Sequence, residues 1–172
     1  MIARKMLPAL KAMEEKGVMH RDLHNGQVMI KFRGLEGVDD YRRILRTVKR
    51  KLLFELNEED FDIVIIDFGR ARTIPGLQFI SSSCKSLKSN LTVYSNRSVR
   101  PKEMRRNNAG NVEYGTEVDI WGFGAIVFEL ATGQGFHDEQ SNIFKSDCDY
   151  TYELASFVEC TTESNPKERS TL

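Results

Sequence analysis

Two acidic residues, Asp22 and Asp67, each lie near a short apolar run that predicts a β-strand. Asp22 precedes the apolar residues 28–30, and Asp67 directly follows the apolar residues 63–66. Two acids at strand ends suit the transfer of a phosphoryl group. One carboxylate orients the proton of an attacking hydroxyl, and the other holds Mg²⁺, a hard cation that prefers carboxylate and phosphate oxygens. The sequence therefore predicts a phosphoryl-transfer site formed by two loops.

The residues around both acids match known signatures. Residues 20–23 spell H-R-D-L and residues 67–69 spell D-F-G, and together these strings resemble the two catalytic motifs of protein kinases. The resemblance implies that Asp22 orients the substrate hydroxyl and that Asp67 bridges Mg²⁺ to the phosphates of ATP. By the same resemblance, residues that support the site are His20, Arg21, Phe68, Gly69, Glu103, Asp119 and Arg169.

Two positions of the first loop depart from the protein kinase pattern. Gln27 stands where the family has an asparagine that holds the second Mg²⁺. Its side-chain oxygen is one methylene further out, and Mg²⁺ tolerates little deviation from ligand distances of about 2.1 Å, so we expect weakened metal binding. His24 stands where Ser/Thr kinases usually carry a lysine that faces the transferred phosphate, and histidine is only partly charged near neutrality. The alternatives are a loop histidine without a catalytic role and a Gln27 that no longer binds metal.

The string D-L-H-x-G at residues 22–26 is also similar to the loops of aminoglycoside and choline phosphotransferases and of haspin-type kinases. Residues 114–133 separate these alternatives. They closely resemble the protein kinase string Y-G-x-x-V-D-I-W-S-x-G-x-I-x-x-E-L-x-T-G, which small-molecule phosphotransferases do not usually carry. The resemblance implies that Asp119 accepts hydrogen bonds from the backbone of the catalytic loop. The small residues Gly122 and Gly124 of this string suit close packing of a helix through the domain.

Residues 70–103 resemble an activation segment, because they are polar and carry many hydroxyl groups between 81 and 98. A phosphate on one of them could pair with Arg21. The segment ends in residues 96–104, which resemble the T-R-W-Y-R-A-P-E-L string of cyclin-dependent and MAP-type kinases at Arg97, Arg100 and Glu103. Residues 165–171 resemble the family's D-P-x-x-R-x-T string, which implies a structural ion pair between Arg169 and Glu103.

The remaining elements follow from periodicity and turn residues. Apolar residues at three- and four-residue spacing predict a helix over 2–16, closed by Gly17, and Phe68 is expected to pack beneath it. A buried strand is expected over 61–66, and a helix over about 150–160. Residues 31–62 form an insertion relative to the kinase pattern, and its helix over about 38–56 has one strongly basic face. That face is either solvated or a docking surface for an acidic partner.

Composition narrows the classes of function. The 172 residues suit one domain, and 25 basic residues balance 25 acidic ones, which argues against bulk electrostatic binding to nucleic acid or to an anionic membrane. The three cysteines are widely spaced and odd in number, so they favour a reducing compartment over a disulfide framework. No apolar run approaches the roughly 20 residues that span a bilayer. Cytoplasm or nucleus is the expected location.

Taken together, these patterns predict a mainly α fold with a small β-hairpin region, and residues 1–172 resemble the C-terminal lobe of a protein kinase without its N-terminal lobe. No glycine-rich phosphate loop or V-A-I-K-type lysine precedes residue 20. The apolar residues Val28, Met29 and Ile30 are expected to face the missing lobe, and Met29 is also expected to contact the nucleotide. The resemblance implies a protein kinase that uses ATP and Mg²⁺ on protein Ser/Thr, inactive or weak without a small lobe supplied elsewhere. The Ser/Thr preference comes from the strings at 97–103 and 114–133 and from the lack of the A-A-R-N string of tyrosine kinases. The alternative is a non-catalytic, kinase-like module that binds proteins.

Overall fold

The structure is a computed structural model that describes residues 1–34, 46, 57–73, 100–104, 115–136 and 151–171. Within these ranges it is mostly helical, as the sequence predicts, and it has two small two-stranded sheets where the sequence predicts one β-hairpin region. The helices are α1 (Ile2–Glu15), α4 (Glu117–Thr132) and α5 (Tyr152–Thr161), and the strands are β1 (Val18–Met19), β2 (Val28–Phe32), β3 (Phe61–Ile65) and β4 (Arg72–Thr73). Of the predicted basic helix at 38–56 the structure describes only Arg46, which is helical, and the hydroxyl-rich stretch at 81–98 lies outside the described residues. None of the described helices is both long enough and apolar enough to cross a bilayer.

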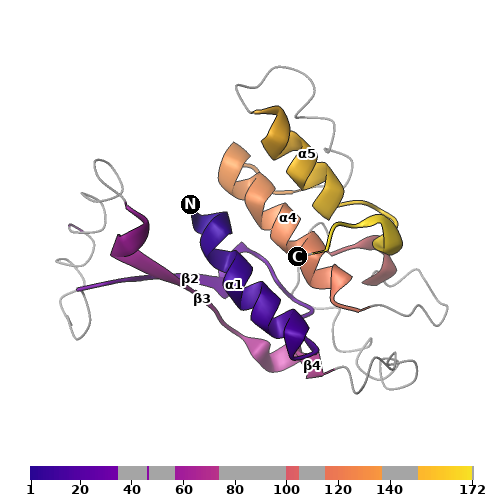
Figure 1. Ribbon diagram of the computed structural model, residues 1–172, viewed down its shortest axis with the longest axis horizontal. Coiled ribbons are helices and arrows are strands. Elements are labelled where there is room, and N and C mark those ends of the chain that lie inside the picture. Colours follow the sequence, from indigo (N-terminus) through magenta and orange to yellow (C-terminus); the bar gives the residue numbers. More distant parts are fainter. Residues whose placement is uncertain (35–45, 47–56, 74–99, 105–114, 137–150, 172) are drawn as a thin grey trace.

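Both sheets are antiparallel pairs. β2 pairs with β3 from Val28 opposite Ile65 to Phe32 opposite Phe61, and the shorter β1 pairs with β4. The β2–β3 ribbon extends away from the α4–α5 pair, and α1 lies against β3 (Figure 1). The predicted strand over 61–66 is thus present and ends one residue earlier. The pairing of β1 with β4 was not predicted, because two-residue strands leave no periodic pattern.

Helix α4 is the centre of the core. All of its residues from Val118 to Phe128 are buried, so it is a helix that neighbours cover on every side. Its aromatic residues pack edge to face with Phe136, whose ring centroid lies 5.8 Å from that of Trp121 and 5.4 Å from that of Phe128. Gly133, with φ of 68°, ends the helix in the left-handed conformation that glycine adopts without a steric penalty.

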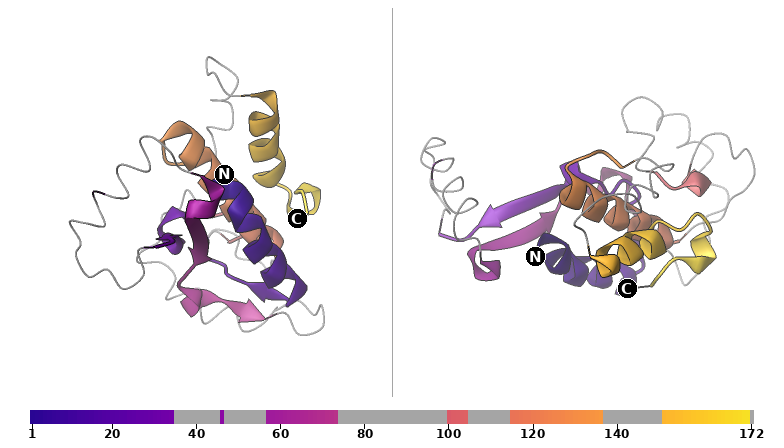
Figure 2. Two further views of the ribbon diagram at one scale, coloured as in Figure 1. Left: turned by 60° about the vertical axis from the view of Figure 1, so that its left-hand side comes forward. Right: turned by 90° about the horizontal axis from the view of Figure 1, so that it is seen from above.

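Two other helices cover α4. In α1, Met6, Leu10 and Met13 form one buried face, and the helix ends at Glu15, one residue before the predicted end. Helix α5 runs beside α4 in both views of Figure 2, and the contact is close at Gly124. A Cβ atom on Gly124 would lie 2.2 Å from Oγ1 of Thr161, so the two helices approach at a distance that only glycine permits.

A second glycine of α4, Gly122, lies against the loop that carries Asp22. A Cβ atom on Gly122 would lie 2.6 Å from the backbone oxygen of Leu23. Because a backbone oxygen cannot rotate away, Gly122→Ala is expected to destabilise the fold by about 1–3 kcal/mol, the usual cost of overpacking. Urea unfolding followed by circular dichroism measures the change. Leu130→Ala, at a half-exposed position of the same helix, is the control, with an expected change of about 0.5 kcal/mol or less. A Gly122→Ala protein as stable as its parent would show that the loop is not packed against this helix.

Candidate active site

The loop that carries Asp22 is held from beneath by Asp119 in the first turn of α4. The backbone N–H of His20 donates to Oδ2 of Asp119 at 2.6 Å, and the N–H of Arg21 donates to Oδ1 at 2.8 Å. Asp119 is only 4% exposed. Burial raises the pKa of its carboxyl group, and the hydrogen bonds from Arg21 and His20 oppose that rise because they favour the charged form. The contact implied by the family resemblance is therefore present, and it fixes Arg21 at a φ of 69°.

His20 joins this loop to the strand end that precedes Asp67. Its side chain is fully buried, and its Nε2–H donates to the carbonyl oxygen of Ile66 at 2.8 Å. The ring of Phe68 lies edge-on to it, with 4.8 Å between the centroids. Phe68 is 45% exposed, so the expectation that it packs beneath α1 is wrong. The short turn after Asp67 places the ring over His20 instead.

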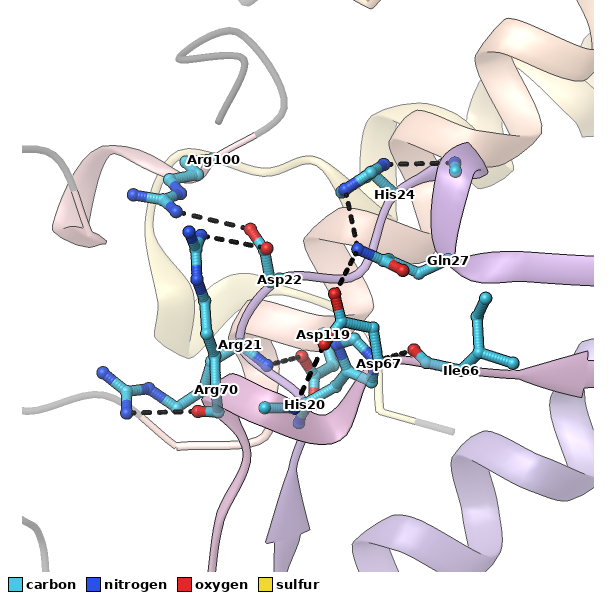
Figure 3. Close-up of polar contacts among 12 residues, drawn as sticks. His20, Arg21, Asp22, His24, Gln27, Ile66, Asp67, Arg70, Arg100 and Asp119 are labelled. Carbon is cyan, nitrogen blue, oxygen red and sulfur yellow. Dashed lines mark hydrogen bonds and ion pairs between the residues drawn. The ribbon is translucent and has the colours of Figure 1, made fainter. Parts of the chain in front are cut away.

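Asp22 lies between two arginines (Figure 3). Nη1 of Arg70 is 2.9 Å from its Oδ2, and Nη2 of Arg100 is 3.3 Å from its Oδ1. Partial burial lowers the pKa of the Arg100 guanidinium, and the charge of Asp22 acts in the opposite direction. Arg100 aligns with the kinase pattern in sequence, but neither its contact with Asp22 nor that of Arg70 was predicted. The signal for Arg70 was its position directly after D-F-G, where a long cation reaches the neighbouring loop.

Asp67 meets the first loop through Gln27. The residue has a φ of 62°, a conformation that few non-glycine residues adopt. Its Oδ1 accepts a hydrogen bond from the N–H of Gly69 at 3.3 Å, and its Oδ2 accepts one from Nε2 of Gln27 at 3.2 Å. The same Gln27 nitrogen is 3.3 Å from Nε2 of His24. Three of the predicted site residues, on two loops, therefore converge on one point, as Figure 3 shows.

The chemistry of these side chains fits Mg²⁺. Asp67 and Gln27 offer one carboxylate and one amide oxygen, and Mg²⁺ is typically held by one or two such protein ligands, with waters and substrate phosphates completing its shell. Among the residues that the structure describes, no group of three or more histidines, cysteines and acids forms a metal cage.

A cavity of about 460 Å³ opens beside Asp22. The loop residues His24 and Asn25 line one wall, and Arg100 and the end of α4 at Glu129 line others. Its polar walls and its position against Asp22 suit a substrate segment that brings a hydroxyl to this carboxylate.

The predicted pair of Glu103 and Arg169 is present and buried. Nη1 of Arg169 lies 2.5 Å from Oε1 of Glu103, and Nη2 lies 3.0 Å from Oε2, so the contact is bidentate. Arg169 also donates to the backbone oxygens of Glu117 and Glu163, and its guanidinium lies 4.9 Å from the ring centroid of Trp121. The pair therefore ties the end of the predicted activation segment to α4. Arg97 lies outside the described residues, so its alignment stays a prediction.

The family model that describes the protein kinase domain matches residues 1–172, the whole of the given chain. Among curated proteins, the serine/threonine-protein kinase ATG1c of Arabidopsis thaliana is 29% identical over 153 residues, which cover 80% of this chain and 19% of that protein. The CTD kinase subunit alpha of Schizosaccharomyces pombe is 27% identical over 146 residues, which cover 83% of this chain and 18% of that protein. The chain thus spans less than a fifth of the length of either relative.

Proposed function

This chain belongs to the protein kinase domain family, and we propose that it provides the catalytic-loop half of a protein kinase that phosphorylates Ser or Thr. One observation carries the proposal. The loop of Asp22 and the loop of Asp67 meet through Gln27, whose amide nitrogen is 3.2 Å from the Asp67 carboxylate. The Arabidopsis relative is named as a serine/threonine kinase, which favours the same substrate hydroxyls.

In this proposal each side chain has one task. Asp67 and Gln27 would hold Mg²⁺, which neutralises charge on the phosphates of ATP when it is bound. Asp22 accepts the proton of the incoming Ser or Thr hydroxyl and orients it. His24 lies in the same loop, with its Nε2 3.3 Å from the amide nitrogen of Gln27. Asp119 and His20 fix the positions of the two loops relative to one another. This matters for the rate, because a shift of about 1 Å in such a site costs a large part of it.

The exposed face of the β2–β3 ribbon supports a further part of the proposal. Met29 on β2 is 53% exposed, and Val64, its cross-strand neighbour on β3, is 41% exposed. The 172 residues contain no glycine-rich phosphate loop ahead of His20. We propose that a small lobe outside the given residues covers this apolar face, and that Met29 then contacts the nucleotide. The given residues alone are expected to transfer no phosphate, because half of the nucleotide cleft would be open to water.

A second candidate is a non-catalytic, kinase-like module that binds proteins. Both carboxylate oxygens of Asp22 lie in ion pairs with Arg70 and Arg100, and Gln27 presents its amide nitrogen to Asp67 rather than its oxygen. Each contact occupies a group that catalysis requires. A protein in which these contacts persist would use the fold for binding alone.

A transfer assay separates the two candidates. The given chain, and a longer protein that joins it to a small lobe, are incubated with Mg²⁺ and radiolabelled ATP and with peptides that contain Ser and Thr or only Tyr. We expect background incorporation from the chain alone and Mg²⁺-dependent incorporation into Ser or Thr from the longer protein. Incorporation into Tyr only would contradict the substrate assignment. Absence of transfer from the longer protein, despite native circular dichroism, would favour the non-catalytic module.

A further inference from the structure

The ring of His24 is held by the backbone of its own loop. The N–H of Gly26 donates to Nδ1 of His24 at 3.1 Å. A nitrogen that accepts a hydrogen bond carries no proton, so the neutral imidazole has its proton on Nε2. His24 therefore presents a donor, not an acceptor, from Nε2.

That donor points at the wrong atom of Gln27. Nε2 of His24 lies 3.3 Å from Nε2 of Gln27, and the same amide nitrogen donates to Oδ2 of Asp67 at 3.2 Å. The N–H groups of His24 and Gln27 thus face one another across the 3.3 Å contact between their Nε2 atoms. Turning the amide by 180° would give His24 an acceptor and would set the amide oxygen against the carboxylate of Asp67. One amide cannot satisfy both neighbours at once, and the hydrogen bond to the charged acceptor is the stronger of the two.

Mg²⁺ held by Asp67 and Gln27 would remove this conflict. The amide oxygen would then be the favoured atom on the side of Asp67, because Mg²⁺ takes oxygen ligands. The same oxygen would accept the hydrogen bond from Nε2 of His24. A contact that stabilises one state only shifts the equilibrium toward that state.

We propose that His24 is a positioning residue for the metal ligand Gln27: its Nε2–H donates to the Gln27 side-chain oxygen and turns that oxygen toward Mg²⁺. The inference rests on the proposed function, since it deepens the account of the same metal site. It gives His24 a task that differs from the phosphate contact implied by the family resemblance. The two departures from the protein kinase pattern, at His24 and at Gln27, are then linked, because the His24 ring orients the Gln27 side chain, which is longer than the asparagine of the pattern.

Gly26 is part of the same arrangement. A Cβ atom at Gly26 would lie 2.9 Å from Cε1 and 3.1 Å from Nδ1 of His24. An alanine there would push the ring away from the backbone N–H that fixes its proton, and so away from Gln27. Gly26→Ala is therefore a second way to remove the effect of His24 without changing the imidazole itself.

The test measures metal affinity and ring protonation rather than activity. MgCl₂ is titrated into the full chain by calorimetry, in the presence and absence of ADP, for the parent, His24→Phe, Gly26→Ala and Gln27→Met, and for the double variant His24→Phe/Gln27→Met. Loss of a side chain that orients a metal ligand typically weakens binding 10- to 100-fold. We expect about a tenfold loss in His24→Phe, a loss in the same direction in Gly26→Ala, and no further loss from His24→Phe when Gln27 is already methionine. Lys31→Ala, an exposed change on β2, is the control and should stay within about twofold, since it removes no ligand or orienting group.

Long-range ¹H–¹⁵N spectra of the labelled chain report the ring protonation of His24, and ¹³C spectra report the side-chain carbonyl of Gln27. We expect a proton on Nε2 of His24 with and without Mg²⁺, and a shift of the Gln27 side-chain carbonyl carbon when Mg²⁺ binds. A proton on Nδ1, or Mg²⁺ affinity that His24→Phe leaves unchanged, would overturn the inference and leave the proposed kinase site intact. Absence of Mg²⁺ binding by the parent chain, with or without ADP, would overturn the proposed metal site and this inference with it.

Discussion

Asp22→Asn, introduced into a protein that joins these residues to a small lobe, is expected to lower kcat for phosphorylation of a Ser or Thr peptide by a factor of about 10² to 10⁴, the usual contribution of a positioned acid or base. Asparagine keeps the size of the side chain and loses the charge that accepts the proton. The KM for ATP should change little, because the predicted metal ligands are Asp67 and Gln27. Initial rates with radiolabelled ATP measure both constants.

Asp62→Asn is the matched control for this change. Asp62 is an acid of β3 whose partner is Arg33, through hydrogen bonds of 2.7 and 3.1 Å. It lies at the solvent-exposed part of the β2–β3 ribbon, so its replacement should leave kcat unchanged. Equal losses in Asp22→Asn and Asp62→Asn would point to a general effect on folding. An unchanged kcat in Asp22→Asn would remove Asp22 from the chemical step.

Arg169→Met is expected to destabilise the fold by about 3–5 kcal/mol, because it leaves the charge of Glu103 buried without its partner. The side chain of Arg169 is fully buried and that of Glu103 is 5% exposed, so water cannot replace the lost guanidinium. The two backbone oxygens that Arg169 contacts lose a donor as well. The midpoint of urea unfolding, followed by tryptophan fluorescence, reports the change, since Trp121 lies directly beneath the guanidinium.

The pair of Arg33 and Asp62 again provides the comparison, since it is also bidentate but exposed to solvent. Arg33→Met should produce no resolved change in the unfolding midpoint. The double change Glu103→Leu/Arg169→Met should recover part of the loss, because it removes both buried charges together. A double variant less stable than Arg169→Met would show that the cost comes from the lost backbone contacts rather than from the stranded carboxylate.

Much of the described fold could be predicted from the sequence. The helix of α1 follows from the spacing of Met6, Leu10 and Met13, and its end follows from Gly17, which has a φ of 60°. The apolar run before Asp67 becomes a strand, as the sequence predicts. These features depend on neighbours in sequence, so local pattern was sufficient for them.

The site was harder to predict because its contacts join distant residues. The two hydrogen bonds to Asp119 could be inferred only from the family resemblance, since no local pattern links positions 20 and 119. The ion pairs of Arg70 and Arg100 with Asp22 were missed, because charge alone does not say which of many acids a cation reaches. Phe68 was placed beneath α1, and the structure gives it His20 as a neighbour because the backbone at Asp67 turns through a left-handed conformation.

The contacts of Asp22 have a consequence for chain length. Arg70 and Arg100 stand at the two ends of one long stretch of sequence, and a single carboxylate ties both ends together. Closing a loop costs entropy that grows only with the logarithm of its length, about 0.6 kcal/mol for each doubling. Changing the number of residues between Thr73 and Arg100 should therefore change the entropic cost of closing this stretch only slightly while both ion pairs hold. The cost of keeping its two anchors on one carboxylate then depends little on the length of chain between them.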